Sequence, residues 1–116
     1  MTTNQGAGSN GAYVPYSDGD IYENFGSTGR KDEVDAGSLN FADWHIYPVY
    51  SKANDSGIYA NGAQVYQTSS NTVGFSSSYK FGRGNEGTPL QAGVKSILMF
   101  TAKTTTPERT LLHAEL

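Results

Sequence analysis

The residues that could act as acids, bases or nucleophiles are few in this sequence, which has two histidines and no cysteine. Asp43 and His45 flank Trp44, and in an extended strand they share one face and could form a hydrogen-bonded pair. No serine has the glycine-flanked context of a hydrolase nucleophile, so a catalytic triad has little support. We interpret His45 and His113 as structural or surface residues and expect no enzymatic activity.

Three carboxylates stand close together at Asp18, Asp20 and Glu23, a spacing that could supply oxygen ligands to a hard cation such as Ca²⁺. The EF-hand loop needs glycine at its sixth position and glutamate at its twelfth, and neither is present. We interpret the cluster as an acidic turn and predict no metal site. Residues 82–87 are similar to a phosphate-binding loop only superficially, because no helix is expected after them, and we predict no nucleotide or other cofactor.

Aromatic residues are the third kind of candidate. Trp44, Tyr47 and Tyr50 follow Asp43 closely, and Tyr and Trp are favoured both at protein interfaces and on sugar-binding surfaces. These four residues are the candidate glycan-binding set of a lectin-like or receptor-binding β domain. In a strand, alternation would place Tyr47 with Val49 on one face and Trp44 with Tyr50 on the other. One set would then pack inward while the other remains available.

The composition indicates that strands position these residues. Ile, Leu, Val and Phe make up only 21 of the 116 residues, whereas Gly, Ser, Thr, Asn and Gln make up 49. These polar residues favour turns and strand faces over helix interiors, and no stretch shows helical periodicity. We predict a single all-β domain, an antiparallel β-sandwich or barrel of jelly-roll type.

Charge and hydropathy argue against two classes of partner. The net charge is -3 and no stretch concentrates basic residues, so we predict no nucleic-acid binding. No apolar run approaches the roughly 20 residues that span a bilayer, and the amino terminus lacks the pattern of a signal peptide. We therefore expect no membrane span and no secretion signal.

The sharpest local signal is Asn61-Gly62 between residues 58–60 and 63–66, because both residues tolerate the positive φ values of a type I′ hairpin turn. The predicted register pairs Ala60 with Ala63, Tyr59 with Gln64 and Ile58 with Val65.

Strands are expected elsewhere along the chain. Residues 72–82 alternate apolar and polar side chains, which is typical of a half-buried strand. Residues 94–103 are apolar on both faces, because Ile97 and Met99 lie opposite Leu98 and Phe100, and this indicates a central strand or one covered by a partner. The remaining expected strands are residues 11–17, 20–25, 39–51 and 110–116, and residues 26–38 are expected to form a polar loop.

Residues 1–10 differ from the rest of the chain, because they contain no large side chain after Met1. We predict an extended polar arm over residues 1–10, docked on a neighbouring molecule or across its own domain, followed by one β domain over residues 11–116. The candidate interface residues are Thr2, Thr3, Asn4, Gln5, Tyr13, Tyr16, Ile97 and Met99.

In its size, its lack of cysteine, its polar arm and its all-β body, the chain resembles the small capsid decoration and cement proteins of tailed bacteriophages. Residues 1–10 and the two-faced segment 94–103 carry the resemblance. It implies a non-enzymatic virion protein, made in the host cytoplasm, that binds a capsid lattice through its arm and an apolar strand face, often as a trimer. Two alternatives stay open: a carbohydrate-binding domain, and a small hydrolase that uses Asp43 and His45.

Overall fold

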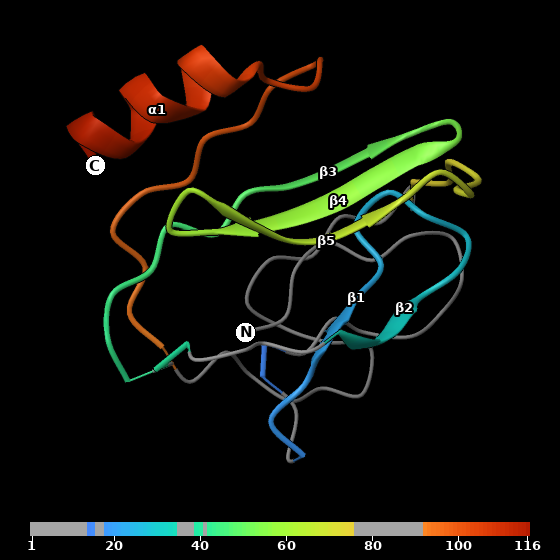
Figure 1. Ribbon diagram of the computed structural model, residues 1–116, viewed down its shortest axis with the longest axis horizontal. Helices are drawn as coiled ribbons and strands as arrows, with labels where there is room; N and C mark the ends of the chain where they lie inside the picture. Colours follow the sequence, from blue (N-terminus) through green and yellow to red (C-terminus); the bar gives the residue numbers. More distant parts are fainter. Residues whose placement is uncertain (1–13, 16–17, 35–38, 41, 76–91) are drawn as a thin grey trace.

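The structure, a computed structural model, describes residues 14–15, 18–34, 39–40, 42–75 and 92–116, with the backbone pairing alone for residues 32–34. Within these ranges the chain forms five strands and one helix (Figure 1). In chain order they are β1 (Ile21–Glu23), β2 (Lys31–Val34), β3 (Val49–Lys52), β4 (Asp55–Ala60), β5 (Ala63–Thr68) and α1 (Thr106–Glu115).

Strands β3, β4 and β5 form a three-stranded antiparallel sheet in that order, and the β4–β5 hairpin is its longest pairing. At its turn Asn61 has a φ of 49° and Gly62 a φ of 85°. Both values are positive, as the type I′ turn requires, so the predicted turn is confirmed. The predicted pairs Ala60–Ala63 and Tyr59–Gln64 are confirmed as well.

The third predicted pair of the hairpin, Ile58 with Val65, is wrong. The register shifts between Ile58 and Tyr59, and Ile58 lies opposite Tyr66. Such a shift leaves one extra residue in β5, which is the definition of a β-bulge. Both Val65 and Tyr66 pack against the core, so the bulge brings a second apolar side chain of β5 to the same cluster.

The core lies where this sheet meets the smaller antiparallel pair of β1 and β2. Its buried centre consists of Val14, Ile21 and Ile58, and Ile21 and Ile58 are 0% and 1% exposed. Tyr47 and Val49 pack against it, which confirms that these two residues share a face and shows that this face is the buried one. The three-stranded sheet does not close on itself, so the described residues show a mostly β fold and no closed barrel.

Buried polar groups supplement this small apolar core. Glu23 is 1% exposed, and its carboxylate accepts hydrogen bonds from the backbone N–H groups of Asn24 and Phe25 (3.0 and 2.9 Å). The Tyr47 hydroxyl donates to the same carboxylate at 3.2 Å. Burial raises the pKa of Tyr47 well above its usual value, and the charge of Glu23 raises it further.

A second polar cluster ties β2 to the three-stranded sheet. The Lys31 ammonium donates to the Ser27 hydroxyl and to the Asn71 side-chain oxygen (2.7 and 2.9 Å), and Asn71 donates to the Ser51 hydroxyl at 3.0 Å. Burial lowers the pKa of Lys31, and the Glu23 carboxylate opposes that shift. Hydrogen bonds therefore connect the two sheets where aliphatic side chains are scarce.

The carboxyl-terminal part of the chain overturns two predictions. Residues 94–103 contain no strand, and residues 110–115 lie in α1 instead of a closing strand. The helix begins with a capping box, in which the Glu108 N–H donates to the Thr105 hydroxyl and the Thr105 N–H donates to the Glu108 carboxylate. This reciprocal pair satisfies two backbone donors at the helix start, and Pro107 suits the first helical turn.

The other expected elements are found in part. The strand expected over 20–25 is confirmed as β1, and that over 39–51 is shortened to β3, which starts after Pro48. The polar loop expected over 26–38 is wrong where β2 forms. Of the strand expected over 72–82, the described part makes an isolated bridge between Ser27 and Val73. Residues 1–13, 16–17 and 76–91, with the predicted amino-terminal arm, lie outside the described residues.

Candidate functional site

The side of the three-stranded sheet that faces away from the core carries aromatic and polar residues. Side chains alternate along a strand, so Ile58 points to the core while its neighbours on β4 point the opposite way. Tyr50 on β3 and Gln67 on β5 both pair with Gly57 and therefore share that opposite side. We call this surface the outer face, and its side chains are Tyr50, Asp55, Tyr59 and Gln67.

We call residues 94–116 the C-terminal arm. The arm passes the end of the three-stranded sheet, and its helix α1 lies on the side of the sheet opposite β1 and β2 (Figure 1). Lys103 is the first anchor of this arm. Its ammonium group donates to the Asp55 carboxylate at 2.8 Å and to the Tyr50 hydroxyl at 2.9 Å, and the Tyr50 hydroxyl donates to Asp55 at 2.8 Å. The same ammonium lies 4.1 Å from the centre of the Tyr50 ring. One cation thus binds a carboxylate, a hydroxyl and an aromatic ring on the outer face.

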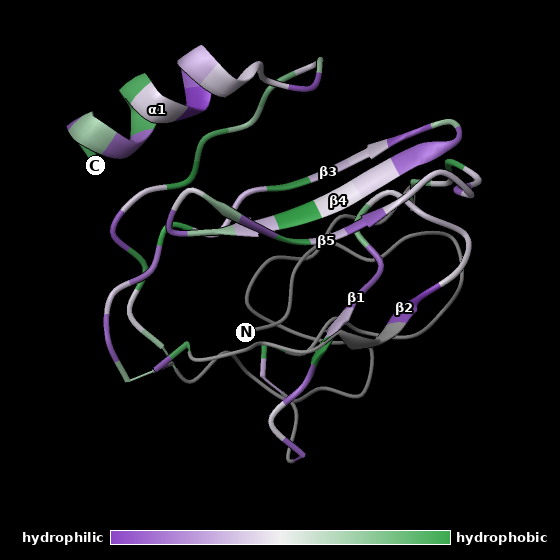
Figure 2. Ribbon diagram, in the orientation of Figure 1, coloured by the Kyte–Doolittle hydropathy of each residue, from purple (hydrophilic) through white to green (hydrophobic). Residues whose placement is uncertain are grey.

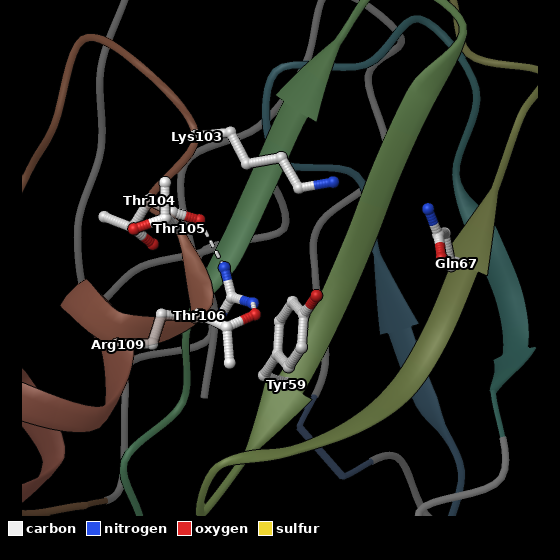
Figure 3. A pocket seen from close by; sticks show the side chains of 7 residues that line it. All are labelled: Tyr59, Gln67, Lys103, Thr104, Thr105, Thr106 and Arg109. Atoms are coloured by element: carbon white, nitrogen blue, oxygen red, sulfur yellow. Dashed lines mark hydrogen bonds between the residues drawn. The ribbon is translucent and has the colours of Figure 1, made fainter.

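Arg109 in α1 is the second anchor. Its guanidinium lies 4.3 Å from the centre of the Tyr59 ring, and it also donates to the Thr104 carbonyl and, at 3.0 Å, to the Thr106 hydroxyl. Tyr59 is only 8% exposed, although it lies on the outer face. Arg109 therefore covers one ring and, through the Thr104 carbonyl, stiffens the segment that leads into α1 (Figure 3).

An open hollow of about 340 Å³ lies between the arm and the outer face, and Figure 3 shows the side chains around it. Its lining consists of Tyr59, Gln67, Lys103, Thr104, Thr105, Thr106 and Arg109. The charged groups of this lining are already bonded to other groups of the chain. The hollow therefore lies beside polar contacts that join two parts of one chain. We call these contacts the clamp: Lys103 with Asp55 and Tyr50, and Arg109 with Tyr59.

Electrostatics favour the charged forms of both partners in the clamp. The hydrogen bond from Lys103 holds the pKa of Asp55 below its usual value of 3.8. The hydrogen bond to Asp55 raises the pKa of Lys103 above its usual value of 10.5. Burial raises the pKa of Tyr50, so its hydroxyl stays protonated and able to donate.

The clamp is weak compared with the core. The Lys103 and Asp55 side chains are 32% and 24% exposed, and an ion pair near the surface is worth about 0–1 kcal/mol. An exposed cation–π contact adds about 0.5–1 kcal/mol. Helix α1 has no buried residue, so apolar burial contributes little to holding it. The arm is attached mainly by polar contacts.

The arm also carries a run of large apolar residues, and Figure 2 colours much of the chain that runs from the end of the sheet to α1 as hydrophobic. The exposed fractions are Val94 43%, Ile97 54%, Leu98 51%, Met99 77% and Phe100 56%. Single exposed apolar residues are common on proteins, but a consecutive run of four is typical of a contact surface.

Helix α1 extends this apolar surface. Leu111 is 68% exposed, and together with Phe100 and Leu112 it lines a shallow hollow of about 230 Å³. The Lys95 ammonium donates to the Leu116 carbonyl at 2.8 Å, which holds the end of the helix beside the start of the arm. The apolar run and α1 therefore form one surface, which we call the apolar patch: residues 94–100 and Leu111.

The predicted glycan-binding residues do not form one site. Tyr47 packs against the core and bonds to Glu23, whereas Tyr50 lies on the outer face in the clamp. The Asp43 carboxylate accepts a hydrogen bond from Asn40 at 2.9 Å. Trp44 is 74% exposed, and its ring lies against the backbone at Gly93, next to the apolar patch.

Of the predicted interface residues, Ile97 and Met99 are described and are exposed within the apolar patch. They do not lie on a strand, so the expected strand face is replaced by an irregular exposed segment. Thr2, Thr3, Asn4, Gln5, Tyr13 and Tyr16 lie outside the described residues.

His45 and the acidic turn have local structural partners. The two ring nitrogens of His45 contact the Asn40 carbonyl and the Asn61 side chain, which links the chain before β3 to the hairpin turn. Asp18 accepts hydrogen bonds from the Asp20 N–H (3.0 Å) and the Tyr22 hydroxyl (2.8 Å). The bond from Asp20 lowers the pKa of Asp18 most, and the bond from Tyr22 lowers it further. Glu23 instead points into the core.

The residues of the clamp were not among the predicted site residues, apart from Tyr50. Lys103 is 48 residues from Asp55, and no local spacing connects two residues so distant. The capping box at Thr105 and Glu108 was the available signal, because it predicts a helix that would carry Arg109.

Two further findings concern metals and membranes. In the ranges that the structure describes, no three His, Cys, Asp or Glu side chains gather into a group that could hold a metal ion. In those same ranges, no helix has the length and apolar character that crossing a membrane requires.

Compared with known protein families, with curated proteins and with solved structures, the chain matches none of them. The fold and the site therefore define a class: a small, mostly β domain whose C-terminal arm is clamped to its own sheet by polar contacts and exposes an apolar patch.

Proposed function

We propose that this protein is a non-enzymatic assembly module, a capsid decoration or cement protein of a virion, that binds other protein subunits through its apolar patch. The observation that carries the proposal is the exposed run from Ile97 to Phe100, in which all four side chains are more than half exposed. The patch takes the place of the apolar strand face expected from the sequence. A jelly-roll-like sandwich and a role for residues 1–10 in attachment belong to the same proposal.

The size of the effect supports an interface. Burying apolar surface contributes about 25 cal/mol per Å², and fully burying a large aliphatic or aromatic side chain contributes about 1.5–3 kcal/mol. Four such side chains on one segment could therefore stabilise a complex considerably if a partner covered them. Leu111 and the nearby Trp44 ring would add to that contact.

The described ionisable groups support a structural role. Glu23 is engaged with backbone N–H groups and Tyr47, and Asp55 is engaged with Lys103 and Tyr50. Each pair holds two segments of the fold together. The glycan alternative draws less support, because its candidate residues lie on both sides of the sheet.

Light scattering coupled to size-exclusion chromatography tests the proposal. We expect the native chain to associate in a concentration-dependent manner, and Ile97→Asp to reduce that association at least tenfold with an unchanged melting temperature, because the side chain is already 54% exposed. Ser96→Asp is the matched control, since it adds the same charge at a polar exposed position of the same segment. A native monomer at every concentration that binds a defined sugar on a glycan panel would overturn the proposal.

The virion part has a separate test. An antibody against the chain should detect it in virus particles purified from the cells in which its gene is naturally expressed, sedimenting with the capsid. A chain that remains at the top of the gradient with every particle preparation would contradict that part.

A further inference from the structure

The C-terminal arm is joined to the outer face in a way that a second molecule could reproduce. Its anchors are two cations, Lys103 on Asp55 and Tyr50, and Arg109 on Tyr59. No residue of helix α1 is fully buried. The complementarity between arm and outer face therefore resides in a few charged and aromatic groups that every copy of the chain carries.

The chain that leads into the anchors is suited to a change of path. Residues 92–102 are exposed throughout and contain no strand or helix, so few contacts oppose their movement. When the arm is docked on its own sheet, the run from Ile97 to Phe100 remains exposed. Docking within one molecule therefore satisfies the cations and leaves the apolar side chains in water.

Docking between two molecules could pair the cations and also cover the apolar side chains. We propose that the C-terminal arm of one copy docks on the outer face of a second copy, with Lys103 and Arg109 making the same contacts there, in a reciprocal exchange of arms. This inference rests on the proposed assembly function and names a second copy of the chain as the partner of the apolar patch. The two crossing segments would run between the domains, where their apolar side chains could cover each other.

Charge complementarity favours a second copy over an unrelated partner. The outer face presents a carboxylate and two tyrosines at the spacing that Lys103 and Arg109 need, as the contacts within one chain show. A reciprocal exchange makes both contact regions identical, as a two-fold symmetric dimer requires.

The test uses charge reversal in trans. Asp55→Lys places a lysine opposite Lys103, and Lys103→Asp places two aspartates opposite each other, so each variant alone has a repulsive clamp. In an equimolar mixture, an exchanged heterodimer has one native clamp and one reversed but complementary clamp. We expect the mixture to form dimers at least tenfold more tightly than either variant alone, as measured by light scattering. The double variant Asp55→Lys/Lys103→Asp is the folding control, since its clamp is complementary with or without exchange.

Each outcome decides between the two proposals. If the mixture behaves as the sum of its parts while the native chain still associates through Ile97, arm exchange is wrong and the assembly function stands. If the native chain is monomeric at every concentration, arm exchange is wrong, and the assembly function fails as well only if that monomer binds a defined sugar on the glycan panel. If circular dichroism shows that a single variant does not fold, a cross-linking experiment replaces the mixture. Cross-linking at introduced cysteines is specific, because the chain has no cysteine of its own. Asp55→Cys in one tagged chain and Lys103→Cys in another should then be joined by a short bismaleimide, and absence of the joined pair would overturn the exchange.

Discussion

The two faces of the three-stranded sheet are covered in different ways. On the core side Ile58 is 1% exposed and packs with Ile21 and Val14 from outside the sheet. On the outer face Tyr59 is also nearly buried, but the guanidinium of Arg109 covers its ring. The ammonium of Lys103 lies over the neighbouring ring of Tyr50. The same strand, β4, supplies both residues, so alternation along one strand separates an apolar contact from a polar one.

The difference lies in what water does when each cover is removed. Exposing the core side hydrates aliphatic surface, which is unfavourable by about 1.5–3 kcal/mol for each large side chain. Removing the arm from the outer face returns two cations and a carboxylate to water, which solvates them well. We therefore expect the core to define the fold and the arm to be free to serve assembly.

The largest effect is expected on the core side. Ile58→Ala removes a fully buried side chain and should reduce the free energy of unfolding by about 2–4 kcal/mol, because the space it leaves is only partly refilled. Gln67→Ala on the outer face is the comparison variant and should change the same quantity by less than about 0.5 kcal/mol. If urea denaturation gave equal losses of unfolding free energy for Ile58→Ala and Gln67→Ala, the two faces would not differ in their contribution to stability.

A change at the hairpin turn should weaken both faces together. Gly62 has a φ of 85°, and Gly62→Val places a β-branched residue in that conformation at a cost of roughly 1–3 kcal/mol. Gly62→Asn is the control, since asparagine tolerates a positive φ better than valine and a Cβ atom at Gly62 meets nothing within 4 Å. A thermal melt of Gly62→Val that matches the native one would contradict the type I′ turn.

A smaller change should loosen the outer face alone. A Cβ atom at Gly57 would lie 2.7 Å from the Tyr50 ring, so Gly57→Ala should displace that ring and with it the contact of Lys103. We expect a loss of about 1 kcal/mol and faster hydrogen exchange in α1, while exchange in β4 changes little. Gly29→Ala, where a Cβ atom meets nothing within 4 Å, should leave α1 unchanged. Slower or unaltered hydrogen exchange in α1 would show that the position of the Tyr50 ring does not affect attachment of the arm.

The smallest effect is the dependence of arm attachment on pH. The pKa of Asp55 is lowered by Lys103, so its contribution is complete above pH about 4 and is lost as the pH falls through the lowered value. The pKa of Lys103 is raised, so its contribution is present below pH about 10.5 and is lost as the pH rises through the raised value. Exchange rates in α1 should therefore rise at both extremes by less than tenfold. Asp55→Asn should abolish the acidic branch, and its persistence would assign that branch to another carboxyl group.

The part of this fold that the sequence predicts is the part determined by neighbouring residues. Asn61-Gly62 specifies the turn, and the turn specifies the nearest pairs of the hairpin. Alternation placed Tyr47 with Val49 on one face and Tyr50 on the other, as found, but it did not indicate which of the two faces would be buried. The bulge beyond Tyr59 was not predictable in this way, because it depends on packing of two β5 residues against Ile21 and Val14.

The C-terminal arm shows why the rest was missed. Its apolar residues at 97–100 suggest a strand, but a strand needs a neighbour that supplies backbone hydrogen bonds, and the sequence does not show whether one exists. The helix had a local signal in the capping box of Thr105 and Glu108. This capping box stabilises the start of the helix more than the neighbouring threonines, with their low helical propensity, destabilise it. The clamp at Lys103 depends on the tertiary structure and has no local signal.

The chain contains one tryptophan, and its ring lies against Gly93 at the root of the arm. Its fluorescence can therefore report arm position without any label, since the indole is 74% exposed and its emission responds to the polarity around it. A shift to shorter wavelength as the protein concentration rises would mean that the indole enters an apolar contact. Stopped-flow dilution would then give the lifetime of that contact directly from the unmodified protein.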